Sequence, residues 1–255
     1  MVPWVLLETA RAPDGDMLRL LRRGEEFSIR IAGGNELMNS RLGGSEEALA
    51  RLAIEAIAPC AAPRILIGGL GMGFTLRAAR ALTGPEARIE VAEIVPQLVG
   101  WAGTHMSEVF GDCLSDPRVS MRIGDVGKMI RDAAPGAHDA ILLDVDNGPD
   151  GLTRPGNDSC YGEAGLRAAY RALAPGGVLN VWSAAPDPAF TRRLEGCGFA
   201  AEAIAVRAAR RGRGSRHMIW RALRPAWGEG GAGDKARARA TRKGASAARI
   251  PGRVA

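Results

Sequence analysis

Short apolar runs alternate with amphipathic segments over most of the chain. The apolar runs predict strands near 64–68, 88–93, 118–123, 139–144, 177–182, 201–207 and 216–222. Alternation of such strands with helices is typical of a parallel sheet that is covered on both faces. The last two runs flank an Arg- and Gly-rich turn, which predicts an antiparallel hairpin at the end of the sheet. We therefore expect an α/β, Rossmann-like fold with seven strands.

The first 43 residues show a different pattern, in which short apolar runs are separated by residues typical of turns. These runs lie near 4–7, 17–21 and 27–31. Turn signals stand at 13–16 and 33–35. The pattern predicts a small antiparallel β subdomain at 1–43, followed by a single Rossmann-like domain at 44–224.

A helix is predicted to begin at the boundary between these two parts. Ser45 is the expected N-cap, because a serine hydroxyl accepts a hydrogen bond from a free backbone N–H of the first turn. Apolar residues then recur at helical spacing from Leu49 to Ile57.

The segment after the strand at 64–68 carries the clearest chemical signal. Gly69, Gly71 and Gly73 allow a tight turn and a close approach of the backbone to a ligand, and a helix follows. Glu93 ends the next strand about twenty residues later, where a carboxylate can accept both hydroxyls of a ribose. This combination predicts a nucleotide-cofactor site. A tight turn without a ligand is the alternative for the glycines, and a cap of the following turn is the alternative for Glu93.

Further motifs resemble one family. They are Thr75-Leu76-Arg77 after the glycine loop, Asp116-Pro117-Arg118-Val119, Gly124-Asp125 and Leu173-Ala174-Pro175-Gly176-Gly177. Over residues 37–221 the chain resembles the spermidine synthase (polyamine aminopropyltransferase) branch of the class I S-adenosylmethionine-dependent methyltransferase fold. The resemblance implies a seven-stranded sheet, a cofactor that is S-adenosylmethionine or its decarboxylated form, and a homodimer.

The resemblance also implies roles for the acids at the strand ends. Glu93 would hold the ribose, and Asp125 would accept from the amino group of adenine. An N-cap of a helix at 126–133 is the alternative role for Asp125, and the two roles are compatible.

Asp144 ends the fourth strand, beside the sulfonium in this fold. An acid there binds the amino end of the cofactor or takes a proton from an attacking amine. The family has a second acid three residues later, where this chain has Asn147, and Asp146 is one residue away. We therefore assign Asp144 and Asp146 as the catalytic acids, with ordinary loop polarity as the alternative for Asp146.

Met72 departs from the family pattern. It stands where spermidine synthases carry an aspartate that holds the amino group of decarboxylated S-adenosylmethionine, and that aspartate would repel the carboxylate of the intact cofactor. A Tyr-His pair of the family is also missing at 46–50. These departures favour intact S-adenosylmethionine.

The loop at 151–161 occupies the place of the family's substrate lid. Arg154 with Asn157 is expected to bind a carboxylate or another anion, and Tyr161 to line the acceptor pocket; a simple surface position is the alternative for Arg154. Trp182, at the end of the fifth strand, either walls that pocket or fills core. None of these residues forms a metal-ligand pattern, so we expect no metal.

The composition is that of a globular protein, with 46% hydrophobic residues and no apolar run long enough to span a bilayer. No signal-like segment follows Met1, and the four cysteines have no paired spacing, so a cytoplasmic protein is expected. Of the net charge of +6, the tail from Trp227 onward supplies +5, from seven basic and two acidic residues. This tail at 225–255 is expected to be disordered, and either solubilises the protein or contacts nucleic acid weakly.

Three functions remain open from the sequence. The first is methyl transfer from S-adenosylmethionine to a small-molecule acceptor. The second is aminopropyl transfer from the decarboxylated cofactor to an amine, with transfer of the aminocarboxypropyl arm as a further variant. The third is a non-catalytic, cofactor-binding scaffold.

Overall fold

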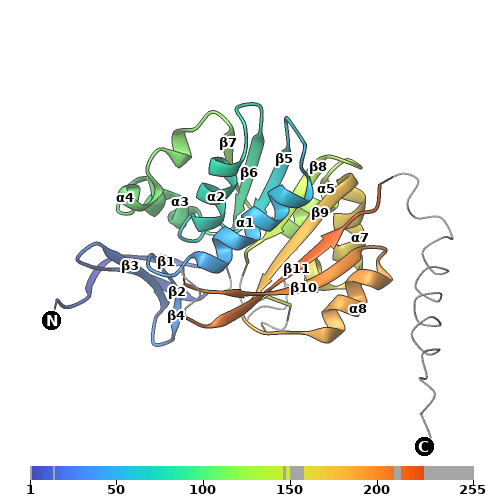
Figure 1. The fold of residues 1–255 in the computed structure, drawn as a ribbon. Helices are drawn as coiled ribbons and strands as arrows, with labels where there is room; N and C mark the ends of the chain where they lie inside the picture. The colour runs from blue at the N-terminus through green and yellow to red at the C-terminus, as the bar shows by residue number, and fades with distance from the viewer. Residues whose placement is uncertain (1, 14, 146–147, 150–157, 210–213, 227–255) are drawn as a thin grey trace, which may run out of the picture.

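A computed structural model describes residues 2–13, 15–145, 148–149, 158–209 and 214–226. The chain forms two sheets, a four-stranded antiparallel one and a seven-stranded, mostly parallel one (Figure 1). Asp146, Arg154, Asn157 and the basic tail from Trp227 lie outside the described residues, so the expectations for them stay predictions. No helix in the described part of the chain is both long and apolar enough to cross a bilayer.

The N-terminal sheet is a meander in the strand order β1-β2-β3-β4. Its strands are β1 (Val5–Arg11), β2 (Met17–Arg23), β3 (Glu26–Ile31) and β4 (Glu36–Asn39). Alternate side chains such as Leu18, Leu20, Phe27 and Ile29 are buried and join the core that continues under the larger sheet. The predicted antiparallel β region is therefore present, and its buried face ties it to the rest of the molecule.

The larger sheet has the strand order β10-β11-β9-β8-β5-β6-β7. Its strands are β5 (Arg64–Gly68), β6 (Arg88–Glu93), β7 (Val119–Ile123), β8 (His138–Leu143), β9 (Leu173–Ser183), β10 (Ala200–Arg207) and β11 (Arg216–Leu223). β11 runs antiparallel to both of its neighbours, β10 and β9, as the predicted final hairpin requires. The chain order reverses between β5 and β8, so the carboxyl ends of these two strands form the crevice where ligands bind in open α/β sheets.

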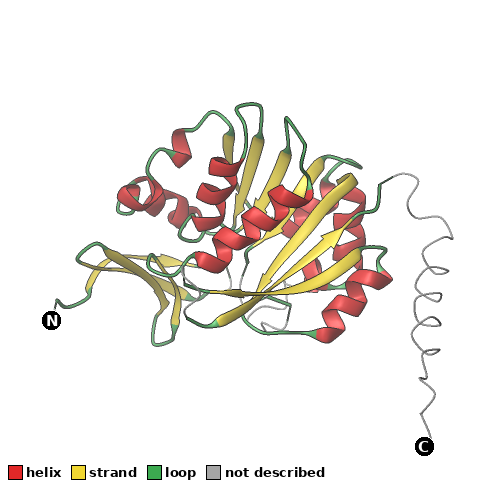
Figure 2. Ribbon diagram, in the orientation of Figure 1, coloured by secondary structure: helices red, strands yellow, loops and turns green. Residues whose placement is uncertain are grey.

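Helices cover both faces of this sheet (Figure 2). They are α1 (Gly44–Ala56), α2 (Phe74–Leu82), α3 (Pro96–Gly103), α4 (Ser107–Phe110), α5 (Val126–Asp132), α6 (Asp158–Tyr161), α7 (Glu163–Ala172) and α8 (Pro188–Gly196), with a short 3-10 turn at Cys113–Ser115. One core lies between the sheet, α1, α2, α3 and the N-terminal sheet. The other lies between the sheet, α5, α7 and α8. The fold is thus the seven-stranded Rossmann-like arrangement of class I methyltransferases, as the sequence predicted.

Two local predictions were wrong. The N-cap of α1 is Gly43, and Ser45 lies inside the first turn, because its hydroxyl faces inward and donates to Glu46 instead of capping the helix. Strand β9 begins at Leu173 and not near 177, because the Pro175–Gly177 turn forms an irregularity within the strand, opposite His138 and Ala140.

Candidate functional site

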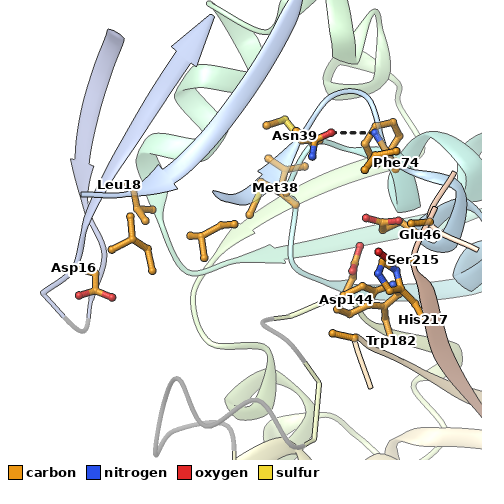
Figure 3. A pocket seen from close by; sticks show the side chains of 18 residues that line it. Asp16, Leu18, Met38, Asn39, Glu46, Phe74, Asp144, Trp182, Ser215 and His217 are labelled. Carbon is orange, nitrogen blue, oxygen red and sulfur yellow. Dashed lines mark hydrogen bonds between the residues drawn. The ribbon is translucent and has the colours of Figure 1, made fainter. Parts of the chain in front are cut away.

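A cavity of about 370 Å³ lies where the crevice of the large sheet meets the N-terminal sheet (Figure 3). Its walls come from the strand ends, from α1 and from β2 to β4. The lining residues are Asp16, Leu18, Ile31, Leu37, Met38, Asn39, Leu42, Glu46, Leu70, Gly71, Met72, Phe74, Asp144, Trp182, Ala184, Ala208, Ser215 and His217. Three of these described residues are acids and none is Lys or Arg.

The predicted glycine loop forms part of the cavity wall, but its three glycines differ in what they contact. Gly71 lines the cavity, with Leu70 and Met72 beside it. Gly69 has a φ of +90°, and a Cβ atom there would lie 2.3 Å from the backbone oxygen of Asp144. Gly73 has a φ of +73°, and a Cβ atom there would lie 2.4 Å from the ring of Phe110. Gly69 and Gly73 therefore fit the packing of the protein itself, and Gly71 alone of the three faces the cavity.

Glu93 fixes this loop from the end of β6. It is only 6% exposed, its Oε2 accepts a hydrogen bond from the backbone N–H of Leu70 at 2.9 Å, and its Oε1 accepts from that of Val95 at 2.8 Å. The carboxylate thus holds the glycine loop against the neighbouring strand and also caps the turn before α3. The capping alternative is present, and the ribose role stays a prediction.

Asp144 directly follows β8 and lines the cavity beside the glycine loop. Thr75, in the first turn of α2, donates a hydrogen bond from Oγ1 to its Oδ2 at 2.7 Å. Burial, together with the nearby carboxylate of Glu46, raises the pKa of Asp144 to about 7. A carboxyl group with such a pKa is able to exchange a proton near neutral pH.

Glu46 is a site residue that the sequence did not single out. It reaches the cavity from the first turn of α1 and lies beside Asp144 in Figure 3. Burial raises its pKa, while the hydrogen bond from Ser45 Oγ at 2.6 Å acts in the opposite direction. The available signal was the Glu46-Glu47 pair, which stands where the resembling family carries its Tyr-His pair.

Trp182 and His217 form the adjacent wall. Their rings pack edge to face with centroids 4.8 Å apart, and both line the cavity. Trp182 therefore lines this cavity, and its role as a wall of an acceptor pocket stays a prediction. His217 Nδ1 lies 2.9 Å from Ser45 Oγ, and burial lowers the pKa of His217.

Two predicted site residues lie elsewhere. Asp125 is the N-cap of α5, where its Oδ1 accepts from the backbone N–H of Lys128 at 2.5 Å.

Tyr161 does not line the cavity; it is 3% exposed, packs edge to face against Phe190, and donates its hydroxyl to the backbone oxygen of Val145 at 3.2 Å. It is a core residue beside the loop that follows Asp144, because its large ring fills the space between α6 and α8.

The N-terminal sheet closes the cavity with mainly apolar side chains. Leu18, Ile31, Leu37 and Met38 line this wall. Asp16, in the turn before β2, lies at the opposite end of the cavity from Glu46 and Asp144 (Figure 3). The cavity therefore has an acidic group at each end and an apolar stretch between them.

Comparison with known proteins finds polyamine aminopropyltransferases among the relatives of this chain. No protein-family model matches the chain. Polyamine aminopropyltransferases of Mycobacterium tuberculosis and Mycobacterium bovis are 29% identical over 167 residues. The match covers 65% of this chain and 30% of each relative, so the chain spans only about a third of the length of these proteins. The chain is spermidine synthase-like.

Solved structures agree at the level of the fold. The spermidine synthase from Thermotoga maritima superimposes with a TM-score of 0.66 at 17% identity, over 86% of this chain and 72% of that one. A spermidine synthase in complex with the transition-state analogue AdoDATO gives 0.65 at 16% identity, with the same coverage. A probable spermidine synthase from Corynebacterium glutamicum gives 0.58 at 20% identity, over 98% and 97% of the two chains. The fold and its resemblance to the spermidine synthase branch are thus confirmed.

Proposed function

We propose that the protein transfers an aminopropyl group from decarboxylated S-adenosylmethionine to an amine acceptor. The observation that carries this proposal is the charge of the cavity: Asp16, Glu46 and Asp144 line it, and no Lys or Arg is among the described lining residues. An acidic cavity attracts ammonium groups and disfavours the carboxylate of intact S-adenosylmethionine. The relatives named polyamine aminopropyltransferase support the same activity.

This proposal replaces methyl transfer as the leading hypothesis. The sequence argument for methyl transfer rested on Met72, which removes one acid from the glycine loop. Glu46 brings an acid to the same cavity from α1, so the electrostatic bias against a carboxylate remains. The missing aspartate at position 72 is therefore no longer an argument for the intact cofactor.

The glycine loop fits the nucleoside part of such a cofactor. In the proposed arrangement Gly71 allows close approach of the ligand at the end of β5, and Glu93 and Asp125 stand at the ends of the next two strands. Glu93 already accepts two backbone hydrogen bonds, and a carboxylate has further lone pairs for the ribose hydroxyls. Asp125 would accept from the adenine amino group with its remaining capacity.

The chemistry requires alignment and removal of one proton. When bound, the sulfonium supplies an activated methylene carbon, to which the acceptor nitrogen bonds as the carbon–sulfur bond breaks. Asp144 would take the proton that the nitrogen loses, since its raised pKa suits a base that works near neutral pH. Trp182 would limit the access of water at this end of the cavity.

The shape of the cavity suggests the class of acceptor. An amine that extends from Asp144 would run along Leu18, Ile31 and Met38 toward Asp16. An apolar stretch with a carboxylate at its far end suits a linear diamine, whose methylene groups contact the wall while the distal ammonium meets Asp16.

Product analysis by mass spectrometry tests this function directly. The purified protein is incubated with 1,4-diaminobutane and either decarboxylated or intact S-adenosylmethionine. The proposal predicts an aminopropylated amine with the decarboxylated cofactor and its loss in Asp144→Asn. A methylated product from the intact cofactor would restore methyl transfer, and binding of both cofactors without any product would favour a scaffold.

A further inference from the structure

The polar contacts around Glu46 form a continuous chain from α1 to β11. Ser45 donates its hydroxyl hydrogen to Glu46 Oε2, with 2.6 Å between the oxygens. The same Ser45 oxygen lies 2.9 Å from His217 Nδ1. Because a hydroxyl has a single hydrogen, Nδ1 must be the donor in the second contact, which assigns the Nδ1–H tautomer to His217. The chain therefore runs from His217 through Ser45 to the carboxylate.

This chain favours the charged form of a carboxylate whose pKa is raised by burial. Burial and the neighbouring Glu47 raise the pKa of Glu46, whereas the hydrogen bond from Ser45 lowers it. Ser45 is fully buried, so water does not replace its hydroxyl easily. The Glu46 carboxylate accepts from Ser45 and from its own backbone N–H, and two carboxylate oxygens have further capacity to accept from a ligand ammonium.

The backbone under Glu46 is also held in place. Asn180, which is fully buried on β9, donates from Nδ2 to the backbone oxygen of Leu49 at 3.0 Å, one turn further along α1. Thr75 Oγ1, the donor to Asp144, lies 3.4 Å from the backbone oxygen of Glu46. These contacts fix α1 against β9 and α2, so that Glu46 and Asp144 keep one arrangement at the cavity.

We propose that Glu46 binds the primary ammonium of the aminopropyl arm, in place of the acid that is absent at position 72, and that Ser45 and His217 position it. This inference rests on the proposed function, because it concerns the same cofactor. Met72 and Glu46 line the same cavity from different elements, the glycine loop and α1, with Asp144 beside Glu46. In this arrangement the acid that binds the ammonium belongs to α1 and not to the glycine loop.

A comparison of two nucleosides tests this contact. Decarboxylated S-adenosylmethionine carries the aminopropyl arm and a sulfonium charge, whereas methylthioadenosine is the neutral thioether that lacks both. Calorimetry with the full chain should show that Glu46→Gln weakens binding of the decarboxylated cofactor by roughly tenfold or more, while methylthioadenosine changes less than about twofold. Glu55→Gln is the matched control, since Glu55 is an exposed acid on α1 that pairs with Arg51 and does not line the cavity; it should leave both affinities unchanged.

The positioning role has its own readout. Among the described residues, the charged and titratable groups near Glu46 are Glu47 on α1, Asp144 after β8 and His217 on β11, while Asp16 lies at the other end of the cavity. Ser45→Ala removes the hydrogen bond that lowers the pKa of Glu46, so the pH at which affinity for the decarboxylated cofactor falls should move upward, with full affinity recovered at higher pH. Ser45→Thr, which keeps a hydroxyl, should restore the original profile.

Several outcomes would overturn the inference. Equal weakening of both nucleosides by Glu46→Gln would show that Glu46 supports the fold only. Unchanged affinity of Glu46→Gln for the decarboxylated cofactor would show that another group holds the ammonium, and an unchanged pH profile in Ser45→Ala would remove the positioning role. Failure of the proposed function would look different, because the unmodified protein would then bind neither nucleoside or would prefer intact S-adenosylmethionine.

Discussion

Thr75 donates a hydrogen bond to Asp144 across the point where the order of the strands reverses. The hydroxyl belongs to the first turn of α2 and the carboxylate follows β8, and their oxygens lie 2.7 Å apart. The bond favours the charged carboxylate, but burial and the repulsion from Glu46 act more strongly and raise the pKa of Asp144 to about 7. Because its pKa is raised in the folded protein, Asp144 affects the pH dependence of stability as well as proton transfer.

Asp144→Asn should therefore change how stability depends on pH. In the folded protein the pKa of Asp144 is raised above its usual 3.8, so the proton is bound more tightly than in the unfolded chain. Its stabilising effect is complete at low pH and is lost as pH rises toward and through about 7. Relative to Asp144→Asn, the unmodified protein should lose roughly 1–3 kcal/mol of unfolding free energy between pH 5 and pH 8.

Urea unfolding of both proteins at several pH values measures this difference. Asp187→Asn is a suitable control, because Asp187 is the part-exposed N-cap of α8 and asparagine also caps helices. Parallel pH profiles for the unmodified protein and Asp144→Asn would show that Asp144 has an ordinary pKa.

Glu93→Ala should destabilise the fold even without a ligand. The substitution leaves the backbone N–H groups of Leu70 and Val95 without their acceptors in a buried region, at a cost of roughly 2–4 kcal/mol. Glu93→Gln keeps one acceptor oxygen and should lower the free energy of unfolding by less. Glu90→Ala, on the same strand, removes a part-exposed ion pair with Arg122 and should cost below about 1 kcal/mol. If Glu93→Ala and Glu90→Ala unfold at the same denaturant concentration, the structural role of Glu93 is wrong.

Two glycine substitutions of the same kind should have opposite effects. Gly69→Ala places a Cβ atom against the backbone of Asp144 at a φ of +90°, and should destabilise the protein by roughly 2 kcal/mol or more. Gly100→Ala adds a methyl group where no atom lies within 4 Å, on the exposed side of α3, and should stabilise it by roughly 0.5–1 kcal/mol. Thermal unfolding measures both changes. Equal melting temperatures for the two variants would contradict the close approach at Gly69.

The strands were predictable because each apolar run is short, rich in branched residues and bounded by turn signals. Arg64–Gly68 and Arg88–Glu93 fall at their predicted bounds. The seven-stranded sheet that these strands form followed from the resemblance to a known fold. Periodicity did not locate the start of β9, because Pro175 and Gly176 are turn residues that the sheet accommodates as an irregularity.

The candidate site could be predicted only for the residues that stand at the ends of predicted strands. The glycine loop, Asp144 and Trp182 stand at strand ends, so strand prediction placed them at the cavity. Glu46 lies on a helix far away in the sequence, and only the packing of α1 against β9 brings it to Asp144. Tyr161 shows the reverse case, since its place in the loop that matches the family's substrate lid suggested a pocket residue, whereas it is buried against Phe190 in the core.

Placing an aspartate at position 72 of the glycine loop is the sharpest test of whether Glu46 replaces the acid that is absent there. Met72 is 3% exposed and lines the cavity with Glu46, so Met72→Asp adds a third carboxylate near two others. In the unmodified background this addition should improve binding of decarboxylated S-adenosylmethionine little, because Glu46 already holds the ammonium and the crowded acids repel each other. In the Glu46→Gln background it should recover roughly 1–2 kcal/mol of the lost binding free energy.

The comparison is a double-mutant cycle on positions 46 and 72, measured by calorimetry with the decarboxylated cofactor and with methylthioadenosine. Met72→Asn, which has the size of aspartate without its charge, separates the effect of the carboxylate from that of lost methionine packing. Since both acids would serve the same ammonium, their effects should be strongly non-additive for the cofactor that carries it and additive for methylthioadenosine. Additive effects for both ligands would mean that side chains at positions 46 and 72 do not bind the same ammonium group. The proposal that Glu46 replaces an acid at position 72 would then be refuted.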